Sequence, residues 1–243
     1  MSSNGASSLL DRPVDFYRPR HTTCTACGHR QVFDLDWFDR WSQGREPCPG
    51  CGVDCTKERA TRIEADPENP ALDDDLVAGL FWWHTSIYPD WPSLGYNPAS
   101  RFDHATVQRM GGVVGVARWT TRQLAKALHV GTYESAIHNM LRWMRDQPEP
   151  DPGTRFYLYG VRLRPDVVVK PGCGREIVNF VGDVPLVEAC PRGIDVSRYV
   201  NEHEDPGGIS LTLGRQAIKA VQRLTIPVAP PARTGCGSEV VAR

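Results

Sequence analysis

The sequence contains no long hydrophobic run and no excess of charge of one sign. None of its apolar stretches approaches the roughly 20 residues that a membrane-spanning helix needs, so we expect no membrane partner. Lys and Arg number 28 against 29 for Asp and Glu in 243 residues. This balance excludes a uniformly basic nucleic-acid binder but leaves a local basic groove open. The N-terminus, MSSNGASSLLDRP, lacks the basic segment and apolar stretch of a signal peptide, so we expect a cytoplasmic protein.

Several catalytic fingerprints are also missing. The glycine-rich segment 111–115 lacks both the Lys-Ser/Thr pair of a P-loop and the spacing of a dinucleotide-binding fingerprint. No Gly-x-Ser-x-Gly elbow occurs, which argues against a serine hydrolase. What remains is the composition of a folded globular protein, with 40% hydrophobic and 23% charged residues.

Four of the eight cysteines stand in two Cys-x-x-Cys-Gly turns, and these turns predict a metal site. Zinc binds four thiolates in a tetrahedron, and two tight turns can supply two thiolates each. Without a signal peptide, this spacing favours metal binding over disulfides. The pattern resembles a zinc ribbon, in which the alternating apolar residues of 31–38 would form a hairpin. Four protein ligands leave no open position, so we expect a structural zinc held by Cys24, Cys27, Cys48 and Cys51.

The distribution of charge divides the chain. Residues 66–76 carry five acids and no base, and their two prolines disfavour regular structure. We interpret them as a linker between a zinc ribbon at 21–65 and a larger domain at 77–227. Residues 1–20 are expected to be a disordered tail, and residues 228–243 a flexible one.

The larger domain is predicted to be α+β, with a mostly antiparallel, twisted sheet. An aromatic-rich run at 77–87 predicts a strand that ends in polar residues. Apolar spacing predicts helices at 101–110, at 118–128 and from Tyr133 onward, with Thr132 as the N-cap of the last. Strands and helices do not alternate regularly enough for a doubly wound fold. Further strands are expected at 128–132, 154–165, 166–170, 177–180, 198–204 and 209–213.

Two carboxylates fall on the predicted strand 198–204. Glu202 and Glu204 would share one face of it, because side chains alternate along a strand. Adjacent carboxylates repel, which raises the pKa of one of them and suits it to acid/base or charge-stabilising work. From the spacing alone, a solvated acidic turn is the competing interpretation.

Taken in order, these segments resemble the ADP-ribosyltransferase fold of the diphtheria-toxin and poly-ADP-ribose-polymerase type. Residues 83–86, Trp-His-Thr-Ser, resemble the family's first strand, which ends in His-Gly-Thr/Ser, but they lack the Gly. Residues 128–132 with Ala136 resemble its middle strand, and His129 stands where the family usually has Tyr. Residues 202–204, Glu-His-Glu, resemble the Glu-x-Glu of the late strand in some branches.

The resemblance implies that NAD is a substrate and that ADP-ribose passes to a macromolecular acceptor. Breaking the nicotinamide–ribose bond creates positive charge on the ribose, which Glu204 would stabilise. Glu202 would help to deprotonate the acceptor, and His84 would bond the adenosine ribose as part of the catalytic set. The NAD-binding residues implied are His84, Thr85, Ser86, His129 and Tyr133.

Other functions stay open on the sequence. The zinc ribbon and the larger domain would also suit a non-enzymatic protein that binds a protein or a nucleic acid. An NAD glycohydrolase and a 2'-phosphotransferase share the implied fold. A cleft that holds both Glu204 and His84 favours an enzyme, whereas a separation well beyond a pocket width of about 15 Å favours a binding protein.

Overall fold

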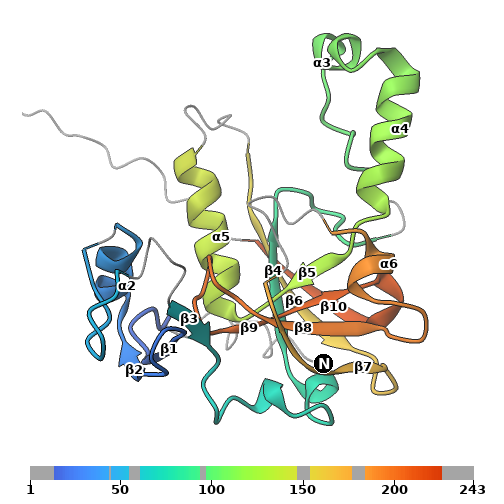
Figure 1. Ribbon diagram of the computed structural model, residues 1–243. Helices are drawn as coiled ribbons and strands as arrows, with labels where there is room; N and C mark the ends of the chain where they lie inside the picture. The colour runs from blue at the N-terminus through green and yellow to red at the C-terminus, as the bar shows by residue number, and fades with distance from the viewer. Residues whose placement is uncertain are drawn as a thin grey trace, which may run out of the picture.

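The computed structural model describes residues 14–43, 45–54, 61–93, 97–146, 154–176 and 184–225, and it contains three small sheets (Figure 1). The N-terminal sheet has the order β2-β1-β3. The second has the order β10-β6-β4, and the third β5-β9-β8-β7. All strand pairs are antiparallel except β7 with β8. The predicted α+β class with mostly antiparallel sheets is therefore confirmed.

The elements follow one another along the chain in no regular alternation. The strands are β1 (Arg20–Cys24), β2 (Arg30–Phe33), β3 (Thr61–Glu64), β4 (Trp82–Ser86), β5 (Leu128–Val130), β6 (Tyr157–Leu163), β7 (Val169–Arg175), β8 (Val196–Val200), β9 (Ile209–Leu213) and β10 (Ile218–Thr225). The helices are α2 (Leu35–Ser42), α3 (His104–Arg109), α4 (Gly112–Leu124), α5 (Tyr133–Asp146) and α6 (Leu186–Ala189), with 3₁₀ turns at Pro70–Leu72, Val77–Gly79 and Arg215–Ala217. Within the described ranges, no helix combines the length and the apolar character that crossing a membrane requires.

The second and third sheets meet where β4 approaches the end of β5. Trp83 and Gly131 exchange two backbone hydrogen bonds of 2.9 Å each. Gly131 is needed at this junction, because a Cβ atom there would lie 2.4 Å from Ser135 Oγ and 2.7 Å from Ser210 Oγ. Helix α5 starts two residues later and packs on β4. The junction thus brings the segment after His84, the start of α5 and strand β9 into one region.

Aliphatic and aromatic side chains from β4, β5, β6, β8 and β9 form the main core. The acidic segment 66–76 packs against this core, since Ala71 is buried within it. Arg198, on β8, donates to the carbonyl oxygens of Ala71 and Leu72 and forms an ion pair with Asp74. These bonds give both terminal nitrogens of the buried guanidinium a partner, which offsets part of the cost of desolvation.

A buried carboxylate joins the N-terminal sheet to the larger part of the molecule. Asp205 Oδ1 lies 2.6 Å from Arg18 Nη2 and 3.1 Å from Arg20 Nη2. Its other oxygen accepts a hydrogen bond of 2.5 Å from Thr132 Oγ1. The side chains of Arg20 and Asp205 are 1% and 0% exposed, so this pair is held away from solvent.

Helices α3 and α4 stand out from the body of the molecule (Figure 1). Neither helix contains a buried residue, and they contact each other. A ring contact of 4.9 Å between Phe102 and Trp119 holds α4 against the segment that leads into α3. We call residues 97–127 the projection.

Five predicted elements differ from the structure in their bounds or type. The predicted hairpin at 31–38 is wrong: β2 ends at Phe33 and α2 follows, because Asp34 Oδ1 accepts a hydrogen bond of 2.7 Å from the amide of Trp37, as an N-cap does. The predicted strand 77–87 shortens to β4, and Val77–Gly79 forms a 3₁₀ turn. The helices expected at 101–110 and 118–128 are α3 and α4, and the first starts after the N-cap Asp103. The strand expected at 166–170 lies further on, as β7.

The predicted strand 198–204 is also wrong in its second half. Strand β8 ends at Val200 because the side chain of Asn201 folds the next residues into a turn. Asn201 Oδ1 accepts hydrogen bonds from the amides of His203, Glu204 and Asp205. Glu202 and Glu204 therefore belong to a turn and not to one face of a strand. The strand expected at 177–180 lies outside the described residues.

We expect Asp205→Asn to lower the free energy of unfolding by roughly 3–5 kcal/mol, because it leaves the buried Arg20 without its counter-charge. Urea unfolding measures the loss. The control is Asp166→Asn, which removes a partner of Arg164 at 3.7 Å with a side chain 73% exposed, and which should cost no more than about 1 kcal/mol. Equal losses in both variants would contradict the role of Asp205 as the buried counter-charge of Arg20.

Candidate functional site

The four cysteines of the two Cys-x-x-Cys-Gly turns come together in the N-terminal module. The sulfur atoms of Cys24, Cys27, Cys48 and Cys51 all lie within 4.8 Å of one another. Cys24 Sγ is 3.9 Å from Cys51 Sγ, and Cys27 Sγ is 3.8 Å from Cys48 Sγ. A tetrahedron with Zn–S bonds of about 2.3 Å places its sulfurs about 3.8 Å apart. The cluster therefore has the size and the donor set of a structural zinc site.

The backbone of the two turns is the same. Gly28 donates its amide to Cys24 O at 2.8 Å, and Gly52 donates to Cys48 O at 2.7 Å. Both glycines have positive φ, 74° and 73°, which other residues adopt at a cost. Each turn thereby points two thiols to one side. A further cysteine close to the second turn, Cys55, lies outside the described residues.

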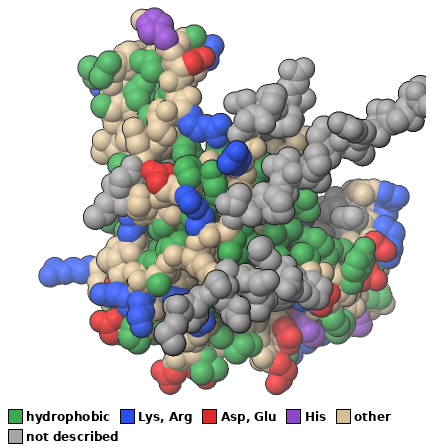
Figure 2. All heavy atoms as spheres, turned by 180° about the vertical axis from the view of Figure 1, so that it is seen from behind, with side chains coloured by type: hydrophobic (Ala, Val, Ile, Leu, Met, Phe, Trp, Pro, Cys, Tyr) green, Lys and Arg blue, Asp and Glu red, His purple; other side chains and the backbone are tan. Residues whose placement is uncertain are grey.

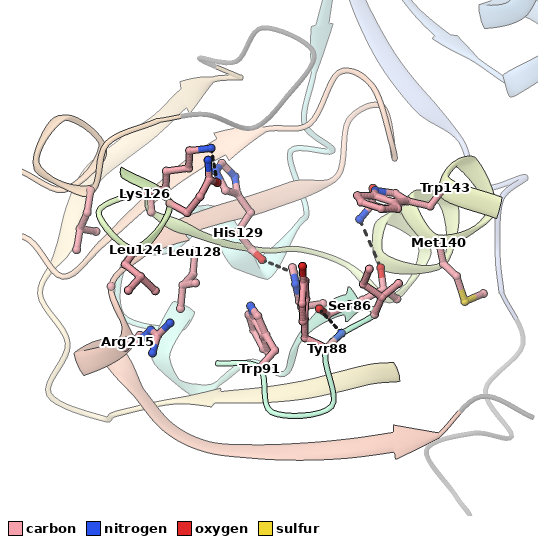
Figure 3. Close-up of a pocket in the computed structure, with 18 of the residues that line it drawn as sticks. Ser86, Tyr88, Trp91, Leu124, Lys126, Leu128, His129, Met140, Trp143 and Arg215 are labelled. Atoms are coloured by element: carbon pink, nitrogen blue, oxygen red, sulfur yellow. Dashed lines mark hydrogen bonds between the residues drawn. The ribbon is translucent and has the colours of Figure 1, made fainter. Parts of the chain in front are cut away.

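The larger part of the molecule contains a cavity of about 460 Å³ on one side of the sheet junction (Figure 3). Its walls come from the end of β4, the loop that follows, the base of the projection, β5 and α5. Four of the predicted NAD-binding residues line it: His84, Thr85, Ser86 and His129. The other lining residues include Tyr88, Trp91, Lys126, Leu128, Met140, Trp143 and Arg215.

His84 is the most constrained polar group in this cavity. Its ring stacks on Trp91 at 4.0 Å with an interplanar angle of 17°. Its Nδ1 donates to the carbonyl of His129 at 2.8 Å, so Nε2 is the acceptor in the neutral ring. Burial lowers the pKa of His84 to about 3, because desolvation disfavours the imidazolium. His84 is therefore neutral at physiological pH.

The two candidate carboxylates have different surroundings. Glu202 Oε1 forms an ion pair of 2.8 Å with Arg175 at the end of β7. Glu204 Oε2 accepts a hydrogen bond of 3.2 Å from Asn201, and Oε1 lies 3.6 Å from Arg142 on α5. The Glu204 side chain is 24% exposed, so it is both held and accessible.

A chain of polar contacts connects Glu204 to both histidines. From Glu204 it runs through Asn201 to Ser210 Oγ at 3.2 Å, and Ser210 on β9 is the register partner of Tyr199 on β8. That hydroxyl shares a hydrogen bond of 3.1 Å with His129 Nδ1. The carbonyl of His129 then accepts from His84.

The same chain closes on its other side through α5. Arg142 Nη2 donates to Asn139 Oδ1 at 2.9 Å, and Asn139 Nδ2 donates to Thr85 Oγ1 at 3.4 Å. Thr85 directly follows His84 on β4. We call this set of contacts, together with the register pair of Tyr199 and Ser210, the polar ring. It contains residues from all three segments that resemble ADP-ribosyltransferase motifs.

Tyr133 is not brought to the cavity. It is 6% exposed and packs edge-on against Trp83, with the ring centroids 5.0 Å apart. Neither Glu202 nor Glu204 is among the residues that line the cavity. The polar ring therefore connects His84 with Glu204, but Glu204 does not line the cavity that His84 lines.

Five residues of the polar ring were not predicted from the sequence: Asn139, Arg142, Tyr199, Asn201 and Ser210. The period of a strand could have indicated Tyr199, because it stands between Arg198 and Val200 and so faces the opposite side of β8. Asn139 and Arg142 lie three residues apart on α5, which places them on neighbouring positions of one face. Nothing in the sequence indicates that this face meets Glu204.

Comparison with protein families, with curated proteins and with solved structures finds no match to this chain.

We expect the purified protein to contain about one zinc ion per chain, as the four-cysteine cluster requires. Cys48→Ser should lose most of the metal and lower the melting temperature, because in so small a module metal affinity contributes folding free energy. Elemental analysis measures the metal. Cys173→Ser, a thiol outside the cluster, is the control and should keep it. Full metal content in Cys48→Ser would exclude the cluster as the ligand set.

The pKa values of His84 and His203 should be shifted in opposite directions from the ordinary value of about 6.5, and an NMR titration of their ring protons measures both. His84 should stay neutral down to pH 5, since its pKa lies at about 3. A hydrogen bond to Glu176 raises the pKa of His203, so its ring should gain a proton above pH 6.5. Because the unfolded chain binds a proton at His84 below about pH 6.5 and the folded state does not, His84 should reduce stability as the pH falls from there. A His84 midpoint near 6.5 would contradict the buried, carbonyl-bonded ring.

Proposed function

We propose that this protein is an NAD-dependent ADP-ribosyltransferase, which breaks the nicotinamide–ribose bond and transfers ADP-ribose to a macromolecular acceptor. The observation that carries the proposal is the polar ring. Three short segments, far apart in the sequence, resemble the motifs of that family. The ring joins His84 directly to the carbonyl of His129. It connects both to Glu204 only through intermediate side chains, among them Asn201 and Arg142. A set of unrelated surface turns has no reason to converge in this way.

Glu204 has the surroundings that the reaction needs. The departing nicotinamide leaves positive charge on the ribose, and a carboxylate stabilises such charge best when it is held in place before the charge develops. Asn201 and Arg142 hold both oxygens of Glu204 while leaving the side chain 24% exposed. Glu204 is therefore the proposed charge-stabilising residue.

His84 is suited to bind a sugar hydroxyl. Its Nδ1 is committed to the His129 carbonyl, so its Nε2 can accept a hydrogen bond from a ribose hydroxyl. Its low pKa keeps this acceptor free of a proton at physiological pH. The stacked Trp91 fixes the plane of the ring, and Ser86 offers a hydroxyl on the same wall of the cavity.

Two expected roles carry less weight in this proposal. Glu202 is occupied by Arg175, so deprotonation of the acceptor by Glu202 requires that ion pair to open. Tyr133 packs in the core beside Trp83, which suits support of the sheet junction better than contact with nicotinamide. The flat rings of His129 and Tyr199, with centroids 6.0 Å apart, lie within the polar ring instead.

The four-cysteine cluster is proposed to bind zinc and to support the site from a distance. Strand β1 carries the ligand Cys24 at one end and Arg20 at the other. Arg20 bonds Asp205, the residue after Glu204. A zinc ion that holds β1 in place would thereby help to hold the Glu204 turn.

The test is release of nicotinamide from NAD by the purified, zinc-loaded protein, with and without a cell lysate. Glu204→Gln should reduce the rate by about 100-fold or more, because it removes the charge and keeps the shape. Glu68→Gln, an exposed carboxylate in the acidic segment, is the matched control and should retain the wild-type rate. His84→Ala should mainly raise KM for NAD.

The outcomes separate the candidate functions. Release that depends on lysate indicates transfer, and release without lysate indicates an NAD glycohydrolase. If there is no release and NAD does not change the melting temperature, the proposal fails, and a binding protein built on the metal module becomes the better interpretation.

A further inference from the structure

The projection carries a strong excess of positive charge, although the whole chain is nearly neutral. Residues 97–127 contain five basic side chains and a single acid, Asp103. The basic residues are Arg101, Arg109, Arg118, Arg122 and Lys126. Asp103 is engaged as the N-cap of α3, where it accepts from the amide of Thr106 at 2.7 Å. The excess is therefore not neutralised within the projection.

Helix α4 directs part of this charge to solvent. Arg118 and Arg122 are both exposed, and one turn of helix separates them, about 6 Å along the axis. Within the described ranges, neither has an ion-pair partner. Val113 and Val114, at 79% and 70% exposed, continue the helix toward the far end of the projection. A helix with no buried residue gains little stability from packing, and its side chains are accessible to a ligand.

The base of the projection is also a wall of the cavity. Gln123, Leu124 and Lys126 line the cavity and directly follow Arg122 in the chain. Figure 3 shows Leu124 and Lys126 on the opposite side of the cavity from Trp143. In the view from behind, Lys and Arg side chains gather where the projection meets the body (Figure 2). Positively charged residues thus lie both on α4 and at the wall of the cavity.

We propose that the projection binds the phosphate backbone of a single-stranded nucleic acid and directs the strand to the cavity. Guanidinium groups along an exposed helix are typical phosphate ligands, and a local basic surface on a neutral protein is the electrostatic footprint of such binding. The proposed nucleic acid is single-stranded because a base within a duplex is stacked and paired, so it cannot enter a cavity in the protein. Binding of the nucleic acid by the projection does not depend on the proposed function. The idea that this nucleic acid is the acceptor of ADP-ribose rests on the proposed function.

The test measures binding of a fluorescein-labelled 20-nucleotide single strand to the full-length, zinc-loaded protein by fluorescence anisotropy, with DNA and RNA of the same sequence. The double variant Arg118→Glu/Arg122→Glu should weaken binding at least tenfold. The dependence of log Kd on log salt should fall by about 1.4, because each phosphate that is no longer neutralised on a single strand removes roughly 0.7. Arg118→Lys/Arg122→Lys, which keeps the charge, should retain most of the affinity.

The control is Arg192→Glu/Lys219→Glu, which makes the same change in net charge at exposed positions outside the projection. It should bind the strand nearly as well as wild type. The inference is overturned if neither strand binds, if both double variants lose affinity equally, or if duplex or a polyglutamate peptide binds as tightly as the single strand. The NAD-induced change in melting temperature is measured without nucleic acid on the same variants and should be unchanged in Arg118→Glu/Arg122→Glu, so that failure of the binding surface and failure of NAD binding are distinguishable.

Discussion

The buried carboxylate of Asp205 is the contact on which the arrangement of this molecule depends. It binds Arg18 and Arg20 from the N-terminal segment and Thr132 from the start of α5. Desolvation lowers the pKa of Arg20, and the charge of Asp205 opposes that shift. An ion pair this deeply buried adds little net stability, but it specifies how the two parts fit, because any other placement leaves a charge buried alone.

The same residue ends the turn that carries Glu204. Asn201 accepts three successive backbone amides, so residues 203–205 have one orientation relative to the end of β8. Asp205 then fixes this turn against Thr132, whose hydroxyl also accepts from the amide of Ser135 at the start of α5. The N-terminal segment with Arg18 and Arg20, the N-terminus of α5 and the turn that carries Glu204 therefore meet at one buried point.

The geometry of the sheet junction explains why a cavity lies beside it. β4 and β5 share only the Trp83–Gly131 bridge and diverge on either side of it. His84 and His129 line the cavity on the diverging side, where the ladder gives way to a side-chain hydrogen bond. The projection departs from the loop after β4 and returns just before β5, so its base forms part of the wall. The cavity and a charged surface are adjacent here because the projection contributes to both.

Local chemistry was sufficient to predict some of these features from the sequence. The cysteine turns are short-range structures that depend on their own glycines, and four thiols at this spacing indicate a shared metal site even though the two turns meet only in the folded module. The α5 helix and its Thr132 cap were predictable for the same reason, since apolar period and capping act within a few residues. The end of β8 was mispredicted because a strand and an Asx turn compete over residues 201–205, and only the buried bonds of Asp205 and Asn201 decide between them. The polar ring required the tertiary structure: Arg142, Asn201 and Tyr199 come from three elements, and their meeting depends on long-range packing that no local pattern encodes.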